Sequence, residues 1–441
     1  MLFSQFETAL DPLATSPRQI VLAFSGGVDS RVLLDLLSTY RDIHPQHRYL
    51  VIHIHHGLST NANHWLKRCE EWATETDFAF RGIKVTLDGQ GESLEKQARD
   101  ARYQAILGAA EQDALVLTGQ HADDQAETFL LALKRGSGPA GLAAMPVVRK
   151  FGHAWLCRPL LNVTRYQIES YAEQQGLTWL EDESNLDCRF DRNFIRQQWM
   201  PMASKRWPGI VKAINRTAAL CAEQEALMEE LLVAHDEKVV QPDSSISIAA
   251  LGDYSANMQN ALVRRWLKRA GVTLTQAQLQ QLFSSVIDAA QDANPSIKLK
   301  MGEIRRYQGR VYIISAYKDV TEWRGALSLN THLVLPDGMG EISLSNAETG
   351  RGLNLRSPAE NEQVCVTFDP EGRFAHPVGR QGKRKLKKLF QEYGVPSWLR
   401  RRTPLIFYGE EIAAVADLFV CDGFGGQDCE LVWHKHHSPS A

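Results

Sequence analysis

The fold of this chain is decided by the stretch Ser25-Gly26-Gly27-Val28-Asp29-Ser30. An apolar run, Ile20–Phe24, precedes it and a leucine-rich run, Arg31–Leu37, follows it, so we expect a buried strand, a tight turn and a helix. Two glycines leave backbone N–H groups bare, and the serine hydroxyls and the helix N-terminus add donors. The loop lacks the Gly-Lys-Ser/Thr ending of a Walker A site. It therefore predicts a phosphate-binding loop of another kind, with a plain glycine turn as the alternative.

Asp29 is unusual in an anion-binding loop, because its carboxylate repels phosphate. A magnesium ion between the two removes the conflict, so Asp29 is the predicted metal ligand. Ser-Gly-Gly-x-Asp-Ser resembles the pyrophosphate loop, or PP-loop, of the ATP-pyrophosphatase superfamily, whose members cleave ATP to AMP and pyrophosphate. The resemblance implies that residues 25–30 bind ATP, commonly to adenylylate a carbonyl or amide-like oxygen. It says little about the second substrate.

Short apolar runs alternate with helical stretches as far as about residue 215. Strands that alternate with helices predict an α/β fold, a Rossmann-like parallel sheet with helices on both faces. The further strands are expected at Leu50–Ile54 and Ala114–Thr118, and the helices at Trp65–Thr74, at Leu94–Leu107 and after the capping box of Thr164 and Gln167. Residues 1–217 are the predicted catalytic domain.

Two smaller domains are expected after it. Residues 218–320 carry long helical periodicity and predict a helical middle domain, with helices at Glu223–Ala234, Met258–Ala270 and Thr275–Ala289. Thr321–Leu333 is interpreted as a connector. Residues 321–441 predict a small α+β domain, with strands at Val364–Phe368, Pro404–Tyr408 and Ile412–Ala416 around one basic helix.

The overall composition excludes several classes of protein. The hydrophobic fraction of 44% and the net charge of −3 are those of an ordinary globular protein, so a polyanion must be held by local basic patches. The seven cysteines contain no Cys-x-x-Cys pair, which argues against a disulfide framework or a zinc or iron–sulfur motif. No signal peptide pattern and no apolar run of about 20 residues is present, so a cytoplasmic protein is expected.

Polar clusters follow the predicted strands, and the carboxyl ends of such strands meet at one edge of a doubly wound sheet. One cluster is His53–Leu58, where adjacent histidines point to opposite faces and so argue against zinc. In the other, Asp124 and Glu127 share a helix face and predict a pocket for a cation such as an amino acid's ammonium group. A solvated acidic first turn is the alternative. His121 is expected to orient phosphate or to act as an acid.

Several cations stand near these clusters in the sequence. Arg102 lies on the predicted helix Leu94–Leu107, and Arg192 and Arg196 are four residues apart. Exposed surface arginines are the alternative to groups that neutralise phosphate charge during adenylyl transfer. The glycine-rich segment Lys134–Gly141 is expected to be a mobile loop that folds over substrate.

At this point the chain resembles the bacterial tRNA(Ile)-lysidine synthetases nearly from end to end. The matching segments are residues 25–30, His55–Leu58, Ala98–Tyr103, His121–Thr128, Leu133–Met145, Arg158–Leu161, Asp182–Arg196, Arg384–Lys388, Gly394–Arg401 and Thr403–Gly409. The resemblance implies that ATP adenylylates the oxygen on carbon 2 of the wobble cytidine in a CAU anticodon. The ε-amine of L-lysine then displaces AMP to give lysidine.

The resemblance also implies roles for single residues. Asp124 and Glu127 would hold lysine, while Arg102 and Arg196 would serve the activated intermediate. The tRNA partner has independent support, because nine basic residues against one acid, Glu392, lie in residues 380–402. Trp398 and Tyr408 are nearby aromatics for packing on ribose or base. Weaker RNA candidates in the middle domain are Arg264-Arg265-Trp266 and Arg305-Arg306-Tyr307.

Two other functions compete with this one. A tRNA thiolase also adenylylates a base but needs reactive cysteines or an iron–sulfur cluster near the loop, and Cys69, Cys157 and Cys188 have no paired spacing. A non-catalytic tRNA-binding protein would not need Asp29 with Asp124 and Glu127. The sequence leaves the oligomeric state open, and a homodimer is one of the states it allows.

Overall fold

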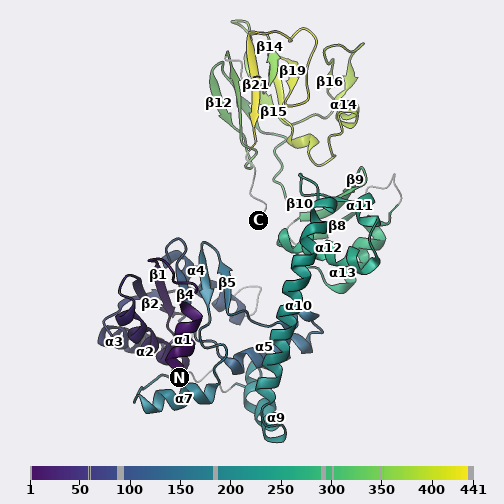
Figure 1. Cartoon of the computed structure of the whole chain (residues 1–441). Coiled ribbons are helices and arrows are strands. Elements are labelled where there is room, and N and C mark those ends of the chain that lie inside the picture. The colour runs from purple at the N-terminus through teal and green to yellow at the C-terminus, as the bar shows by residue number, and fades with distance from the viewer. Residues whose placement is uncertain are drawn as a thin grey trace. The chain divides into compact units, whose positions relative to one another are not determined.

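The computed structural model describes residues 2–57, 59, 61–86, 94–181, 187–289, 295–299, 302–346, 350 and 352–435. The chain divides into two compact units, Met1–Glu230 and Leu231–Ala441, and Figure 1 labels their elements. No helix within these described ranges is both long enough and apolar enough to cross a membrane. The three domains predicted from the sequence divide the chain more finely and remain a prediction.

A six-stranded sheet forms the centre of the first unit. Its order is β3 (Ala79–Lys84), β2 (Arg48–His55), β1 (Gln19–Ala23), β4 (Leu115–Leu117), β6 (Ala154–Cys157) and β5 (Val148–Phe151). The first five strands run parallel. The edge strand β5 is antiparallel to β6, because the two form a hairpin that turns at Gly152 with a φ of +57°. The predicted parallel sheet is confirmed, with one antiparallel edge strand added.

Helices cover both faces of this sheet, as predicted. Ile20 and Leu22 of β1 point into a core with α1 (Leu2–Leu10), α2 (Val28–Ile43), α3 (Ala62–Glu75) and α7 (Arg165–Gln174). Val21, between them, points to the opposite face and packs in a second core with Ile106 of α4 (Leu94–Ala109). Alternate residues of β1 thus pack into two hydrophobic layers, one on each face of the sheet, and this packing holds the carboxyl end of the strand in place.

Most predicted elements of this region are confirmed. The apolar runs at Ile20–Phe24, Leu50–Ile54 and Ala114–Thr118 coincide with β1, β2 and β4 to within two residues at most ends. The capping box before α7 is present: Thr164 Oγ1 accepts from the Gln167 N–H at 3.3 Å, and Gln167 Oε1 accepts from the Thr164 N–H at 2.9 Å. Strands β3, β5 and β6 are short or half-exposed and were not predicted.

A third layer of helices completes the unit. It contains α5 (Ala122–Lys134), α6 (Pro139–Leu142), α8 (Asp191–Phe194), a π-helical turn (Ile195–Trp199), α9 (Met200–Arg206) and the first part of the long α10 (Ile210–Val239), which continues into the second unit. Ala126 and Phe129 of α5 pack against Met200 of α9 and Ile214 of α10. The predicted loop at 134–141 is shorter than expected, because its end forms the turn of α6.

The second unit begins with helices and a small sheet. The helices are α11 (Ile248–Gly252), α12 (Ala256–Arg269) and α13 (Gln276–Leu282), which continues as a π-helical turn (Phe283–Ile287). Four antiparallel strands, in the order β7 (Ile246–Ser247), β10 (Arg310–Ser315), β9 (Gly302–Tyr307) and β8 (Ser296–Leu299), share their core. Helices α12 and α13 coincide with predicted helices, whereas α11 and this sheet were not predicted.

The rest of the second unit is rich in strands. One sheet has the order β11 (Arg324–Ala326), β15 (Val364–Thr367), β18 (Leu405–Tyr408), β19 (Glu411–Val415) and β20 (Phe419–Val420). A second has β12 (Thr331–Val334), β13 (Glu341–Ser345), β21 (Cys429–His434) and β14 (Leu353–Leu355). A two-stranded ribbon, β16 (Phe374–Ala375) with β17 (Arg384–Lys385), leads into the basic helix α14 (Leu386–Glu392).

The interpretation of Thr321–Leu333 as a connector is wrong. This segment contains β11 and the start of β12, and each joins a different sheet. The strands are only three and four residues long and mostly exposed, so they leave no apolar alternation in the sequence. The strands predicted at Val364–Phe368, Pro404–Tyr408 and Ile412–Ala416 are confirmed as β15, β18 and β19.

Candidate active site

The strand order creates a topological switch point between β1 and β4. From β1 the chain passes through α2 to β2, whereas β4 lies on the other side of β1. Loops that leave two such strands diverge, and ligands of doubly wound sheets bind between them. Gly119, just after β4, lies against the PP-loop: a Cβ on it would stand 3.2 Å from the Cβ of Asp29. The PP-loop and the His121 segment therefore meet at one place.

The PP-loop is organised around the hydroxyl of Ser30. The Gly26 N–H donates to Ser30 Oγ at 3.0 Å, and Ser30 Oγ donates to the Gly27 carbonyl at 2.9 Å. Ser25 Oγ lies 3.1 Å from the same hydroxyl. Gly27 caps α2 without a side-chain hydrogen bond, so the N–H groups of the first helical turn remain available to an anion. Val28, the first residue of α2, is buried and fixes this turn to the core.

Asp29 lies between two cationic or titratable partners. Arg165 Nη1 donates to its Oδ2 at 2.9 Å, and His121 Nε2 lies 3.6 Å from its Oδ1. Burial raises the pKa of Asp29, and His121 and Arg165 oppose that effect. Oδ1 is buried and accepts no hydrogen bond among the described residues. One oxygen of this carboxylate therefore remains open to a further cation.

His121 is the N-cap of α5 and faces three carboxylates. Its Nδ1 accepts from the Asp123 N–H at 3.2 Å, while the Asp124 carboxylate accepts from the His121 N–H at 3.1 Å. Nε2 lies 3.4 Å from Asp124 Oδ2 as well as 3.6 Å from Asp29 Oδ1. Burial lowers the pKa of His121, but the surrounding carboxylates outweigh it and raise the pKa. His121 therefore links the PP-loop to the acidic start of α5.

The two acidic residues predicted to form a cation pocket do hold a cation. Arg196 Nη2 donates to Asp124 Oδ1 at 2.9 Å, and its Nε donates to Glu127 Oε1 at 2.7 Å. Arg192 Nε lies 3.1 Å from Glu127 Oε2. Glu127 is only 2% exposed, and burial raises its pKa against the pull of Arg196. The exposed acidic turn is thereby excluded for Glu127, and the two arginines bind carboxylates in this structure.

Arg102 lies beside the second strand end. Its Nε donates to His56 Nε2 at 3.4 Å. Burial and the charge of Arg102 lower the pKa of His56 to about 4, so His56 is a neutral acceptor. No hydrogen bond or ion pair joins Arg102 to the PP-loop within the described residues. Among the described residues, no group of three His, Cys, Asp or Glu is placed to hold a metal ion.

The structure thus brings together most of the predicted site and adds two residues. Asp29, His121, Asp124, Glu127 and Arg196 form one connected network. The additions are Arg165, paired with Asp29, and Asp123, whose carboxylate accepts from the Arg165 N–H at 2.8 Å. The capping box at Thr164 predicted the start of α7 from the sequence. No local pattern predicted that Arg165, the first residue of this helix, would pair with Asp29. Residues 182–186, part of a matched segment, lie outside the described residues.

The basic segment of residues 380–402 is partly neutralised. Arg380 and Arg384 pair with Glu392, Arg401 pairs with Glu371, and Arg402 pairs with Asp337. Lys383, Lys385, Lys387 and Lys388 are exposed, and within the described ranges none of them has an ion pair. Four lysines therefore remain for a polyanion.

Several aromatic and basic residues considered for RNA binding are structural. Tyr408 is 2% exposed and its hydroxyl donates to the Arg356 carbonyl at 3.2 Å, so its interpretation as an exposed stacking residue is wrong. Trp398 packs against Tyr307 and Tyr312, with ring centroids 5.7 and 5.3 Å apart. In the middle region Trp266 and Arg306 are buried, and Arg265 pairs with Asp236.

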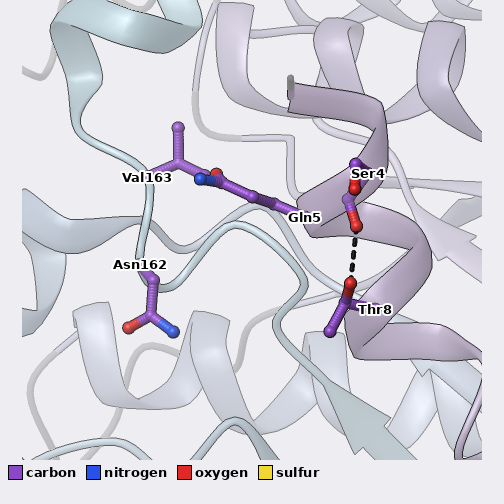
Figure 2. Close-up of a pocket in the computed structure, with 5 residues that line it drawn as sticks. All are labelled: Ser4, Gln5, Thr8, Asn162 and Val163. Carbon is purple, nitrogen blue, oxygen red and sulfur yellow. Dashed lines mark hydrogen bonds between the residues drawn. The ribbon is translucent and has the colours of Figure 1, made fainter.

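A separate hollow of about 270 Å³ lies between α1 and the segment after β6 (Figure 2). Ser4, Gln5, Thr8, Asn162 and Val163 line it, and Thr8 Oγ1 donates to the Ser4 carbonyl at 2.7 Å. None of these side chains is charged, so the hollow offers no ion pair to phosphate or ammonium groups. It is not part of the candidate site.

Comparisons with known proteins give matches to family models and to a solved structure. Family models match a PP-loop domain at residues 2–203, a TilS substrate binding domain at residues 246–312 and a TilS substrate C-terminal domain at residues 364–436. The solved structure of the U34-tRNA thiolase NcsA from Methanococcus maripaludis aligns with a TM-score of 0.43 and 16% identity, over 50% of this chain and 78% of that one.

Full-length relatives are much more similar. The tRNA(Ile)-lysidine synthase of Vibrio campbellii is 49% identical over 446 residues, which span 98% of this chain and 99% of that protein. The tRNA(Ile)-lysidine synthase of Photobacterium profundum is 48% identical over 435 residues, with the same shares of the two chains. This chain therefore belongs to the tRNA(Ile)-lysidine synthase family, whose members are built on an ATP-using PP-loop domain.

Proposed function

We propose that this enzyme ligates L-lysine to carbon 2 of the wobble cytidine of tRNA(Ile) with a CAU anticodon. ATP is cleaved to AMP and pyrophosphate, and the product, lysidine, changes decoding from AUG to AUA. One observation carries the proposal: His121 joins Asp29 of the PP-loop to Asp124 of the acidic pair, so a phosphate site adjoins a cation site. A ligase that joins a nucleotide-activated base to an amine needs both.

The first half of the reaction belongs to the PP-loop. The triphosphate of ATP would lie on residues 25–30, with N–H groups of the first turn of α2 as donors. Asp29 fits Mg²⁺, because its buried Oδ1 lacks a hydrogen bond in the described structure and Mg²⁺ is commonly held by one or two carboxylates plus substrate phosphates. Such an ion would neutralise phosphate charge there. Arg165 fixes the other oxygen of Asp29 and so orients the carboxylate.

Adenylylation then activates the base. Transfer of AMP to the oxygen on carbon 2 of cytidine converts that oxygen into a good leaving group and makes carbon 2 electrophilic. Negative charge on the α-phosphate needs nearby cations, and Arg102 and Arg196 are the proposed ones. His121, whose pKa is raised by its carboxylates against the effect of burial, can carry a proton beside the phosphates.

The lysine pocket would be formed by Asp124 and Glu127. Both carboxylates already accept hydrogen bonds from the guanidinium of Arg196, which shows that they hold a cation at this place. The lysine ammonium group would therefore replace Arg196 there. Arg196 would then be released toward the AMP-activated cytidine. The ε-ammonium would lose one proton to become the attacking amine and a second once carbon 2 is bonded, and these protons would go to a carboxylate of this pair and to water.

The tRNA would be held mainly outside the catalytic domain. We assign residues 1–217 to catalysis, 218–320 to a middle domain that assists tRNA binding and 321–441 to a tRNA-binding domain. The exposed lysines of residues 380–402 support the last assignment. A tRNA substrate would place the enzyme in the cytoplasm.

The cysteines disfavour a thiolase. Burial raises the pKa of both Cys69 and Cys157 to about 12, so neither is a thiolate at neutral pH. Cys188 donates to Gln197 Oε1 at 3.4 Å and has no cysteine partner, since the described cysteines are all free. A sulfur carrier beside the PP-loop is therefore not available.

The test is incorporation of radiolabelled lysine into unmodified tRNA(Ile) bearing CAU, with ATP and magnesium. We expect labelling of the tRNA to require ATP and magnesium as well as lysine. The variant Asp29→Asn, whose side chain is of equal size, should reduce the labelling at least about 100-fold, as for loss of a group that stabilises transition-state charge. Methionine tRNA with the same anticodon is the substrate control and should stay unlabelled. AMP release that requires a sulfur donor instead of lysine would refute the proposal.

A further inference from the structure

A second hollow, of about 300 Å³, lies on the strand-rich part of the second unit. It is lined by residues of β11, β15 and β18 and of the neighbouring loops, namely Arg324, Cys365, Thr367, Arg373, Phe407, Gly409 and Glu410. Thr367 pairs with Arg324 across β11 and β15, and Cys365 pairs with Phe407 across β15 and β18. Paired residues share a face, so the hollow occupies one face of this sheet.

The opposite face of the same sheet forms the core. Val364, Val366 and Ile406 alternate with the lining residues and are buried in the main cluster. A solvent-side sheet face normally needs only exposed polar side chains, yet Thr367 is 6% exposed and its hydroxyl has no hydrogen-bond partner in the described structure. A buried hydroxyl without a partner is costly, and Thr367 is one of the residues that line the hollow. Thr367 therefore has a donor that the described residues do not use.

Two arginines flank this hydroxyl in different ways. Arg373 is held in place, because its guanidinium lies 4.8 Å from the ring centroid of Phe407 and its Nε donates to the Asp369 carbonyl at 2.8 Å. Its two terminal nitrogens have no hydrogen bond or ion pair among the described residues. Arg324 is exposed and has no ion pair within the described ranges. With Glu410 at the rim, the lining carries a net charge of +1 and suits one phosphate group.

A backbone hydrogen bond links the hollow to the basic segment. Arg373 directly precedes β16, which pairs with β17, and the Leu386 N–H at the start of α14 donates to the Arg373 carbonyl at 3.0 Å. The exposed Lys387 and Lys388 lie on that helix. Cations in a pocket and on a helix joined to it suit a polymer of phosphates better than a free phosphate.

We propose that this pocket binds a single phosphate-bearing nucleotide of the tRNA. The inference rests on the proposed function only in taking tRNA as the polyanion. The phosphate would accept from Arg324 and from the Thr367 hydroxyl. The base would stack on the face of the Arg373 guanidinium that Phe407 leaves open, as bases do on arginine planes in RNA complexes.

The first experiment measures the Kd of the intact protein for tRNA(Ile) by filter binding over a range of salt concentrations. We expect Arg324→Ala to weaken binding about tenfold, as for loss of one charge-assisted hydrogen bond, and to lower the salt slope by about one. Lys435→Ala, which removes an equal charge from the residue directly after β21, is the charge control and should change the Kd much less. Equal effects of the two changes would mean a general charge effect and would overturn the proposal.

Thr367→Val separates binding from folding. Removal of an unpartnered buried hydroxyl should leave the midpoint of thermal unfolding unchanged or raise it. The same change should weaken tRNA binding severalfold if the hydroxyl donates to phosphate. Unchanged tRNA binding in this variant, together with wild-type binding by Arg324→Ala, would overturn the proposal without any concern about folding.

The thiol of Cys365 provides a direct probe of the pocket. It is half-buried and lines the hollow, so a small alkylating reagent read out by peptide mass spectrometry reports its accessibility. We expect tRNA to protect Cys365 in the wild type and not in Arg324→Ala. Protection by inorganic phosphate or AMP but not by tRNA would assign the pocket to a small phosphate compound and overturn the proposal. Lysine ligation is measured separately, so its failure would refute the proposed function alone.

Discussion

Gly26 of the PP-loop has a φ of +87°, whereas Gly27 beside it has a φ of −70° that any residue adopts. A Cβ on Gly26 would stand 2.7 Å from Leu180 and 2.9 Å from Cys69, while on Gly27 the nearest atom would be 3.6 Å away. We expect Gly26→Ala to cost at least about 1–2 kcal/mol of unfolding free energy, the cost of a left-handed backbone for an L-residue. Gly27→Ala should cost less than about 0.5 kcal/mol.

Thermal unfolding of the two variants beside the wild type measures this difference. ATP binding by Gly27→Ala then reports how closely phosphate approaches the backbone, free of any folding defect. Equal Tm values for both variants would mean that the loop adjusts around a methyl group at Gly26.

His121 makes a pH-dependent contribution to stability. Burial lowers its pKa, but the carboxylates of Asp123, Asp124 and Asp29 raise it further, to above the value of an unfolded histidine. A raised pKa means that protonated His121 stabilises the fold below the unfolded pKa of about 6.5, and that this stabilisation is lost as pH rises through the folded value. We expect His121→Asn, which keeps an N-cap acceptor, to make the unfolding free energy depend less on pH in this range.

Urea denaturation at several values between about pH 5.5 and 8.5 tests this. The control is Thr164→Ser, a substitution that changes no titratable group and should leave the dependence of the unfolding free energy on pH unchanged. A His121→Asn profile as steep as that of the wild type would contradict the assignment.

For single residues, the sequence predicts which side chains belong to the site better than it predicts which of them contact each other. The PP-loop residues were predictable because strand, glycines and helix are contiguous, and Asp124 and Glu127 because helical spacing puts them on one face. Arg165 was not predictable as the partner of Asp29, because 136 residues separate the two and only the sheet brings them together. For the same reason the binding of Arg196 to the acidic pair could not be predicted.

Among the elements, α7 links a helix cap to the active site. Thr164 caps it, and the next residue, Arg165, donates to Asp29. We expect Thr164→Ala to cost about 1 kcal/mol, a typical N-cap loss, and to lower the Tm by about 2–4 °C. It should also weaken ATP binding, because the cap holds Arg165 at the PP-loop.

Thr164→Ser, which keeps the hydroxyl, is the matched variant and should behave like the wild type. Differential scanning calorimetry and ATP titration measure the two effects. Loss of stability with unchanged ATP affinity would separate α7 from the site and contradict the coupling.

Whether an element could be predicted depended on its burial. Strands β1 and β4 are buried along their centres, so their apolar runs are plain in the sequence. Strands β11 and β12 are mostly exposed and short, and they exist because β15 and β13 provide hydrogen bonds. Such pairing is set by distant residues and leaves no local pattern.

For the whole molecule, the separation of the hydrophobic cores predicts the result of truncation. The last core contains only residues from Val320 onward, and the cores of the preceding parts contain none of these. We expect a chain that ends at residue 320 to fold and to bind ATP with nearly the affinity of the full chain. Its affinity for tRNA should fall by at least about 100-fold, because the exposed lysines are lost with their counterion release.

Titration of both chains with ATP and with tRNA provides the comparison. A control is the full chain with Lys387 and Lys388 both changed to alanine, which should lose part of the tRNA affinity and none of the ATP affinity. Similar losses for both ligands on truncation would contradict a division of labour between the parts.

The helix α10 has residues in both units: Ile214 and Ala218 pack in a core of the first, and Leu232 and Val239 in a core of the second. Helix formation is cooperative, so melting of one half frays the other. The parts built on these two cores should therefore unfold in one merged heat-capacity transition on warming, and a proline in the middle of α10 should split it into two. In the wild type, a ligand that stabilises one unit would therefore raise the melting temperature of the part of the other unit that α10 joins to it. This thermodynamic link requires no change of shape.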